Sequence, residues 1–249
     1  MILCLLVWAP AALAVVNVES AQFGEPEDGL SVSAEIGLDG TSGNTDKFGF
    51  NAGARLQWHR QSHTDLGLFS YRYGKSRGRA DTNKSFAHVR HMQHMNPRIT
   101  LEGFGQAEKN EFSRLSFRGL IGMGVRRVLF AGEASDRVFL GFGAMYEHEE
   151  LQPRSGATDA LQSRLWRGNF YFSVKHRLNE QIRVVSSTYY QPRLDDWGDA
   201  RLLEQAALMV KLSEMLDVKL SLEMQHDSRP PQQVEKTDIT YATGLELHF

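Results

Sequence analysis

The chain has 249 residues, of which 28 are Lys or Arg and 30 are Asp or Glu, so its net charge is −2 at neutral pH. That balance gives no electrostatic reason to expect nucleic acid as a partner. Beyond residue 14 no apolar run approaches the roughly 20 residues of a membrane-spanning helix, so helical spans are excluded and a single β domain is expected.

The first residues have the pattern of an export signal. Met1 to Ala14 form an apolar run that closes in Ala12-Leu13-Ala14, the spacing of a signal-peptidase site. We therefore predict a signal peptide over residues 1–14, a short periplasmic tail over 15–28 and the folded domain over 29–249. Cys4, the one cysteine, would leave with the signal, so the exported chain would form no disulfide.

From Leu30 onward, apolar and polar side chains alternate. Because strand side chains have a period of two, each such segment presents one apolar face and one polar face. The clearest segments are 30–38, 47–60, 115–126, 138–146, 166–175, 206–212, 218–225 and 241–249. The apolar row of the third comprises Leu115, Phe117, Ile121, Met123 and Val125. In 65–73, 85–95 and 182–190 both faces are mixed, so the pattern sets no register there.

Breaks in the alternation divide the chain into about twelve strands. Short turns are expected at Gln61–His63, Asn96–Arg98, Ala131–Glu133, Asn179–Glu180 and Ser213–Glu214. Other polar connections, generally longer, are expected at Ser42–Asp46, Gly74–Lys84, Lys109–Glu111, Glu150–Ala160, Pro192–Asp199 and Ser228–Glu235. An even strand count with short turns at the end that holds both termini is typical of outer-membrane barrels, whereas alternation alone also suits a soluble sandwich. We predict an all-β fold, a transmembrane antiparallel up-and-down β-barrel of about 12 strands in the bacterial outer membrane, in contact with lipid and lipopolysaccharide.

The final strand carries an aromatic terminal pattern. Tyr241, Leu245, Leu247 and Phe249 share one strand face, and the chain stops on Phe249. This end resembles the terminal β-signal that the barrel-assembly machinery recognises. The resemblance implies that machinery and periplasmic chaperones as partners, by class.

A hairpin corner and a charged connection carry a family resemblance. Thr41-Ser42-Gly43-Asn44 lies between two amphipathic strands, and Glu108 to Phe112 precedes a strand that leads to Gly122 and Gly124. The chain thereby resembles the salt-induced outer-membrane protein family, a domain family of unknown function. The resemblance implies an outer-membrane barrel but no catalytic residues. Gly43 and Asn44 both tolerate positive φ, so a tight turn explains the corner, with a ligand-binding loop as the alternative.

The polar faces would enclose charged side chains in the barrel interior, the lumen. The candidate lumen charges are Glu35, Arg55, Glu102, Arg118, Arg126, Arg167, Arg183, Lys219 and Glu223. Buried charges require partners or water, so these residues either form ion pairs that plug a narrow barrel or line a small aqueous channel. If the lumen is open, their basic excess predicts a mild preference for anions.

Other clusters contain residue types that can bind metal ions. His88, His91 and His94 are three residues apart, and on a strand such neighbours face opposite sides. The acidic run Glu147 to Glu150 with Asp159, and Asp195 with Asp196 and Asp199, are expected in outer loops, where they would be solvated or bind divalent ions. We expect no metal and no cofactor.

A twelve-strand outer-membrane barrel can also be a lipid hydrolase, which needs a Ser and a His within hydrogen-bond reach. Ser186 and Ser187 lie on a strand without His, while His148 and His226 lie near strand ends. We therefore predict a non-catalytic barrel that serves as a narrow pore or as an envelope-integrity or salt-stress element. The alternatives are an outer-membrane lipid hydrolase and a soluble periplasmic β-barrel that binds an apolar ligand.

Overall fold

The computed structural model describes residues 28–42, 46–132 and 136–247. In that part of the chain, 12 strands form one antiparallel sheet in which every strand pairs with its neighbours in sequence. The strands are β1 (Gly29–Thr41), β2 (Lys47–Arg60), β3 (His63–Ser76), β4 (Arg79–Asn96), β5 (Ile99–Asn110), β6 (Leu115–Ala131), β7 (Arg137–Leu151), β8 (Gln162–Arg177), β9 (Ile182–Arg193), β10 (Asp196–Lys211), β11 (Leu216–Asp227) and β12 (Thr237–Leu247). A 3-10 helix, η2 (Glu111–Ser113), lies between β5 and β6. The prediction of an all-β, antiparallel, up-and-down arrangement of about twelve strands is confirmed.

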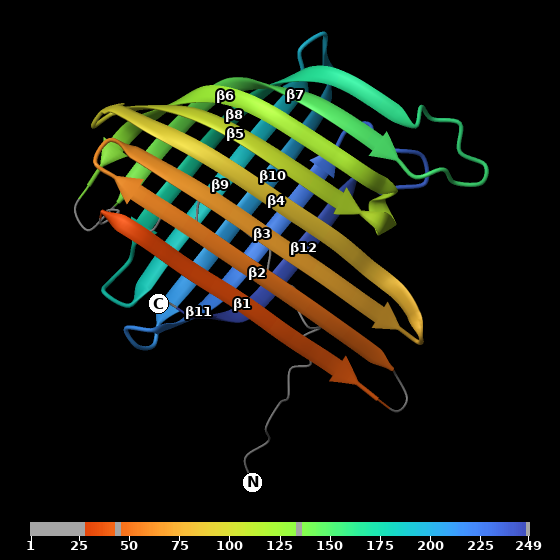
Figure 1. The fold of residues 1–249 in the computed structure, drawn as a ribbon, viewed down its shortest axis with the longest axis horizontal. Helices are drawn as coiled ribbons and strands as arrows, with labels where there is room; N and C mark the ends of the chain where they lie inside the picture. The colour runs from red at the N-terminus through yellow and green to blue at the C-terminus, as the bar shows by residue number, and fades with distance from the viewer. Residues whose placement is uncertain (1–27, 43–45, 133–135, 248–249) are drawn as a thin grey trace.

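The sheet is rolled about a central lumen, as Figure 1 shows. Cα atoms of β1 and β12 come within 8 Å of each other, although the described residues of these two strands form no ladder with each other. The first and last strands therefore face each other across a seam. Among the described residues, no helix is long and apolar enough to cross a membrane.

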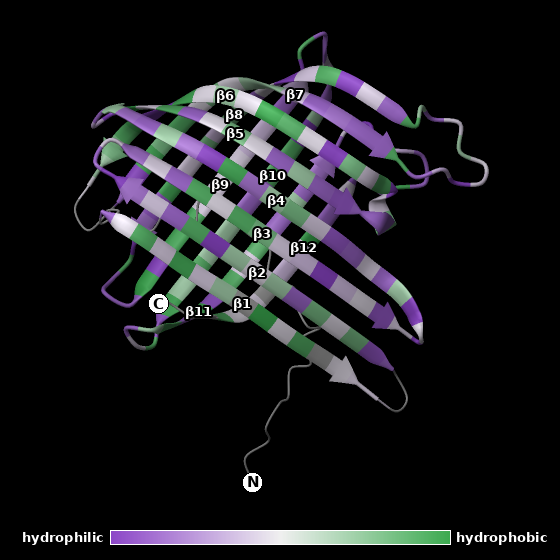
Figure 2. Cartoon of the chain, viewed as in Figure 1, coloured by the Kyte–Doolittle hydropathy of each residue, from purple (hydrophilic) through white to green (hydrophobic). Residues whose placement is uncertain are grey.

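Alternation along each strand separates an outer surface from the lumen, and Figure 2 shows it as bands of opposite hydropathy. Outward apolar side chains are left exposed, including Ile36 at 76%, Ile121 at 67% and Met123 at 73%. On the inward parity, Met145 and Val185 are fully buried. An apolar outer surface over many strands is what a lipid-facing sheet needs, because hydrocarbon solvates apolar side chains and not charges.

Strands β3, β4 and β9 explain the segments in which both faces were mixed. Leu66 and Leu68 on β3 point into the lumen and pack against Met92 and Phe86 of β4. On β9, Val185 and Tyr189 are also buried inside. The lumen thus accepts apolar side chains beside charged ones, which removes the contrast between the two faces that periodicity depends on.

Two expected connections were too long. The structure continues β3 to Ser76 and starts β4 at Arg79, and it continues β9 to Arg193 and starts β10 at Asp196. Only Arg77 and Gly78 remain between β3 and β4, both at positive φ (50° and 74°). The prediction of loops at Gly74–Lys84 and Pro192–Asp199 was wrong because strand pairing uses backbone groups, so a ladder can extend through polar sequence beyond the apolar band.

Leu115 was also assigned to the wrong face. The pairing of β6 with β7 shifts between Leu115 and Phe117, and Leu115 is only 3% exposed whereas Phe117 is 40% exposed. One extra residue at a bulge reverses which face the following side chains occupy. This irregularity turns Leu115 inward.

The two ends of the rolled sheet differ. The start of β1 and the end of β12 lie at the end that holds the β2–β3, β4–β5, β6–β7, β8–β9 and β10–β11 connections. The opposite end, called the loop end below, carries the two long connections 152–161 and 228–236. The terminus end is called the turn end. Predicted signal and tail residues 1–27 lie outside the described residues.

Candidate functional site

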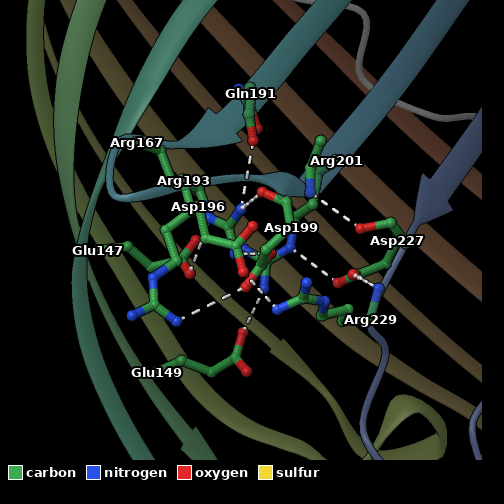
Figure 3. A network of polar contacts seen from close by, with 12 residues as sticks. Glu147, Glu149, Arg167, Gln191, Arg193, Asp196, Asp199, Arg201, Asp227 and Arg229 are labelled. Atoms are coloured by element: carbon green, nitrogen blue, oxygen red, sulfur yellow. Dashed lines mark hydrogen bonds and ion pairs between the residues drawn. The ribbon is translucent and has the colours of Figure 1, made fainter.

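Glu147 on β7 is the centre of an ion-pair network inside the loop end of the lumen (Figure 3). Its side chain is 1% exposed and is approached by three guanidinium groups from β6, β8 and β10. The Arg167 Nε atom lies 3.3 Å from Oε1, the Arg118 Nε atom lies 4.0 Å from Oε2, and Arg201 also pairs with Oε2. A buried carboxylate is stable here because cations from several strands compensate its lost hydration.

Further ion pairs extend the network around the lumen. Arg118 Nη2 lies 2.7 Å from Glu149 Oε2, and its Nη1 lies 3.5 Å from Glu108 Oε2. Lys84 on β4 is 3.5 Å from Glu108. Together with Glu147 these contacts form a continuous chain of alternating charge from β4 to β7.

The network continues on the other side of Glu147. Arg201 Nε lies 2.9 Å from Asp227 Oδ2 on β11, and Arg167 Nη2 lies 3.0 Å from Asp199 Oδ1 on β10. Arg167 also donates to the backbone carbonyls of Gln191 and Asp199, both at 3.2 Å. We call these connected side chains the charge belt. They are Lys84, Glu108, Arg118, Glu147, Glu149, Arg167, Asp199, Arg201 and Asp227.

A cavity of about 200 Å³ adjoins the charge belt at the loop end. Its charged lining residues are the cations Arg72, Lys84, Arg90, Arg118, Arg201 and Lys236 and the acids Glu108, Glu147, Glu223, Asp227, Glu235 and Asp238. Cations and anions are equal in number. The basic excess expected from the sequence is therefore absent from the cavity lining, and with it the reason for an anion preference.

On the turn-end side of the cavity, four buried side chains contact one another inside the lumen. Arg126 Nε lies 2.8 Å from Glu102 Oε1 and donates to the Tyr171 hydroxyl at 2.8 Å, and that hydroxyl donates to Glu102 Oε2 at 2.6 Å. Arg90 Nη1 lies 3.8 Å from Glu102. All four side chains are at most 5% exposed. We call Arg90, Glu102, Arg126 and Tyr171 the polar plug; their low exposure shows that they are closely packed inside the lumen.

Four of the remaining candidate lumen charges, Arg183, Glu223, Arg55 and Lys219, have described side chains on the inward parity. Arg183 pairs with the buried Asp217. Glu223 accepts hydrogen bonds from Gln205 and Gln225. Arg55 and Lys219 are partly buried on β2 and β11, and Glu35 lies on β1, although its side chain is outside the described part of the structure.

Arg114 ties the loops at the loop end together. Its backbone is left-handed (φ 58°), and its side chain is 4% exposed. Its Nη1 donates to both oxygens of Asp159 in the 152–161 connection at 3.0 Å and to the Gln232 carbonyl in the 228–236 connection at 2.9 Å. Pro230, Pro231 and Val234 of the latter connection line the cavity.

The contacts at Arg114 also change the acidity of Asp159. Burial raises the pKa of Asp159, but hydrogen bonds from Arg114 and from backbone groups outweigh the effect of burial and hold that pKa below its usual range.

Two of the acidic residues expected in outer loops lie in the lumen, whereas Asp159 and Asp195 are in connections at the loop end, as expected. Glu147 and Glu149 belong to β7 and face the lumen, so their assignment to an exposed loop was wrong. Asp195, Asp196 and Asp199 each pair with an arginine: Arg193, Arg229 and Arg167 respectively. Within the described ranges, no group of three or more His, Cys, Asp or Glu is placed to hold a metal ion. The signal that identifies Glu147 is its parity, because it continues the inward row of Arg137 and Met145.

The other histidine and serine candidates are separated by the fold. His88 and His94 face inward and contact Gln106 and Thr100, while His91 faces outward and contacts Asp65. Ser186 donates to Glu204, Ser187 bonds Ser173, His148 contacts Glu150, and His226 contacts Thr237. The contacts of these serines and histidines do not join into a nucleophile and base pair. A non-catalytic role stays a prediction.

Two sequence signatures are described in part. Thr41 ends β1 and Ser42 follows it, while Gly43 and Asn44 lie outside the described residues. Tyr241 and Leu245 are 56% and 60% exposed on β12. The backbone of Leu247 belongs to β12, but its side chain and Phe249 lie outside the described part.

Comparison with known proteins bears on fold and family. The family model described as "Protein of unknown function, DUF481" matches residues 34–249. None of the curated proteins matches the chain. The salt-induced name suggested by the sequence stays a prediction.

Two solved structures share the architecture. The NanC porin has 10% sequence identity and a TM-score of 0.51, over 88% of this chain and 99% of that chain. The translocator domain of the autotransporter NalP from Neisseria meningitidis has 10% identity and a TM-score of 0.52, over 92% of each chain. At this identity the likeness concerns the fold, which is that of outer-membrane β-barrels.

Proposed function

Because this chain belongs to the DUF481 family, a family of unknown function, and shares its fold with outer-membrane barrels, we propose that it spans the bacterial outer membrane and forms a narrow pore for small polar solutes. The observation that carries the proposal is the cavity of about 200 Å³ inside a rolled sheet whose outward side chains are apolar. A lipid-facing exterior with a polar interior is the arrangement of a membrane pore.

The chemistry of the lumen suits small polar solutes. The charge belt provides cationic donors and anionic acceptors, and we expect the closely packed polar plug to narrow the lumen on the turn-end side of the cavity. A solute that crosses the barrel would then have to displace part of the plug. Transport would be slow and selective by size, unlike flow through a wide, water-filled porin.

Membrane insertion brings further partners. The apolar exterior would contact lipid, and the loop end would face lipopolysaccharide, because outer-membrane barrels place their longer loops outside the cell. Tyr241 and Leu245 on β12 belong to the terminal strand that resembles an insertion signal, so the assembly machinery and periplasmic chaperones are the expected folding partners. These partners rest on class and on the terminal strand.

The first test is the mobility of the washed membrane fraction in SDS gels with and without boiling. A closed barrel resists SDS and runs faster until it is heated, so we expect a membrane-bound band that shifts on boiling. A soluble, unshifted band would contradict the membrane proposal and favour a soluble barrel with an apolar ligand.

The second test addresses the pore. Purified protein in planar bilayers should give small conductance steps, and Tyr171→Ala should enlarge them because Tyr171 is part of the polar plug. The matched control is Tyr146→Ala, since Tyr146 lies on the outward parity and contacts Trp166. Absence of conductance in both the native protein and Tyr171→Ala would contradict a pore and leave an envelope-integrity role.

A further inference from the structure

Glu223 on β11 is a buried carboxylate that forms no ion pair with a cation among the described residues. Its residue is 5% exposed and lines the cavity. It accepts hydrogen bonds from Gln205 Nε2 at 3.0 Å and from Gln225 Nε2 at 2.6 Å. No Lys, Arg or His of the described chain forms an ion pair with it, in contrast to every carboxylate of the charge belt.

Beside Glu223 an acceptor is unused. Gln205 is 6% exposed and lines the same cavity, and its buried Oε1 atom has no hydrogen-bond partner in the described part of the chain. The orientation of this amide is determined by Glu223, because rotating it by 180° would direct its oxygen at the carboxylate. The Gln205 oxygen therefore remains an acceptor that awaits a donor.

These two features call for the same kind of group. A buried carboxylate without a counter-cation and a buried acceptor without a donor each cost free energy. A group that carries positive charge and several N–H donors would compensate both costs at once. A primary ammonium group has three such donors and no acceptor.

The surroundings favour an organic ammonium over a bare metal ion. The cavity also has an apolar part of its lining, so apolar surface is present in the same space as the acids. Its residues are Phe86, Phe104, Tyr189, Met145 and Leu203. Its volume of about 200 Å³ exceeds that of a single ion. Rings and aliphatic side chains can cover the carbon skeleton of a small solute while its charged end reaches the acids.

We propose that Glu223, Gln205 and Gln225 form a subsite for the primary ammonium group of a small organic solute that enters the cavity from the loop end. This subsite deepens the proposed pore function, since it assigns a chemical class to the solute. It predicts selection by the charge and donors of the solute, on the β10–β11 wall of the lumen.

The experiment is saturation-transfer NMR with butylammonium chloride and the full-length barrel in detergent micelles. We expect a saturable signal in the native protein and at least about tenfold weaker binding in Glu223→Gln, which keeps the shape of the side chain but removes its charge. Gln205→Met, which removes the unused acceptor, should also weaken binding. The matched control is Glu235→Gln, because Glu235 lines the same cavity without contributing to the subsite.

Each outcome decides the proposal. Weakening confined to Glu223→Gln and Gln205→Met supports it. Equal weakening by Glu235→Gln, displacement of butylammonium by an equal concentration of potassium, or no saturable signal would overturn it. Binding in micelles does not require conduction, so a bound but non-conducting barrel would refute the pore and leave the subsite intact. Each variant must first show the gel shift on boiling that marks a folded barrel.

Discussion

Arg201 on β10 and Glu147 on β7 form an ion pair across the lumen although 54 residues separate them in sequence. Strands β8 and β9 lie between them in the sheet, so the contact crosses the interior and does not follow neighbouring strands. Arg118 and Arg167 contact the same carboxylate. Glu147 therefore connects the charges on β4 to β7 with those on β8 to β11.

Removing the charge of Glu147 should destabilise the barrel. In Glu147→Gln three buried or partly buried guanidinium groups lose their shared counter-charge, and we expect a loss of about 3–5 kcal/mol in the free energy of unfolding. Urea unfolding in lipid vesicles measures it. Glu150→Gln is the control, because the Glu150 side chain is 41% exposed and, in the described part of the chain, its ionisable partner is His148. Equal losses in both variants would show that the network contributes nothing specific.

Gly141 makes room for the polar plug. It is paired with Tyr171 across β7 and β8, and a Cβ atom at Gly141 would lie 2.0 Å from Tyr171 Cε1. Gly141→Ala should displace the ring, disturb its hydrogen bond to Glu102 and cost about 1–3 kcal/mol. Thermal unfolding of the variant in detergent checks this value.

The control for Gly141→Ala is Gly103→Ala on β5, where an added Cβ would meet nothing within 4 Å. Its unfolding should be close to that of the native protein. A larger loss at Gly103 than at Gly141 would contradict the packing argument.

The outward face should reject charge if it contacts lipid. Ile121 lies within β6 with its side chain 67% exposed, and Ile121→Arg should cost about 2–4 kcal/mol in a bilayer. Leu161→Arg is the control, since Leu161 is 44% exposed but precedes β8 at the loop end. Folding yields into vesicles compare the two. Comparable yields would mean that Ile121 faces water.

The stabilising contact between Arg114 and Asp159 at the loop end should depend on pH. Because contacts with Arg114 lower the pKa of Asp159, this carboxylate stabilises the folded state at neutral pH, and the contribution is lost as pH falls through the lowered value. Asp159→Asn should cost about 1 kcal/mol at pH 7, and the difference from native protein should vanish under strongly acidic conditions. Unfolding measured from pH 7 down to pH values below the usual aspartate pKa, about 4, follows this change.

A carboxylate at the turn end of the barrel provides the control for Asp159→Asn. Glu180 is exposed in the connection between β8 and β9. Glu180→Gln should leave stability unchanged at pH 7. A pH-independent loss in Asp159→Asn would point to the hydrogen bonds of the side chain and not to its charge.

The architecture was accessible from the sequence because it depends on a local property. Phe48, Leu56 and Trp58 alternate with polar residues at a period of two, and that period alone requires a strand with one apolar face. The repeated breaks then set the strand count. The same reasoning failed at Leu115, where one bulged residue reversed the facing, and at Gly74–Lys84, where polar residues continue a ladder held by backbone hydrogen bonds.

The candidate site could be predicted from the sequence only in part. Parity placed Arg118, Arg167 and Glu223 on the inner face, since inward and outward positions follow from strand periodicity. Which charges meet depends on how far the sheet curls and how its strands are staggered, and these are properties of the whole barrel. Only the complete barrel therefore determines three features of the site. They are the ion pair of Glu147 with Arg201, the contact of Arg114 with Asp159, and the position of Glu223 away from the described cations.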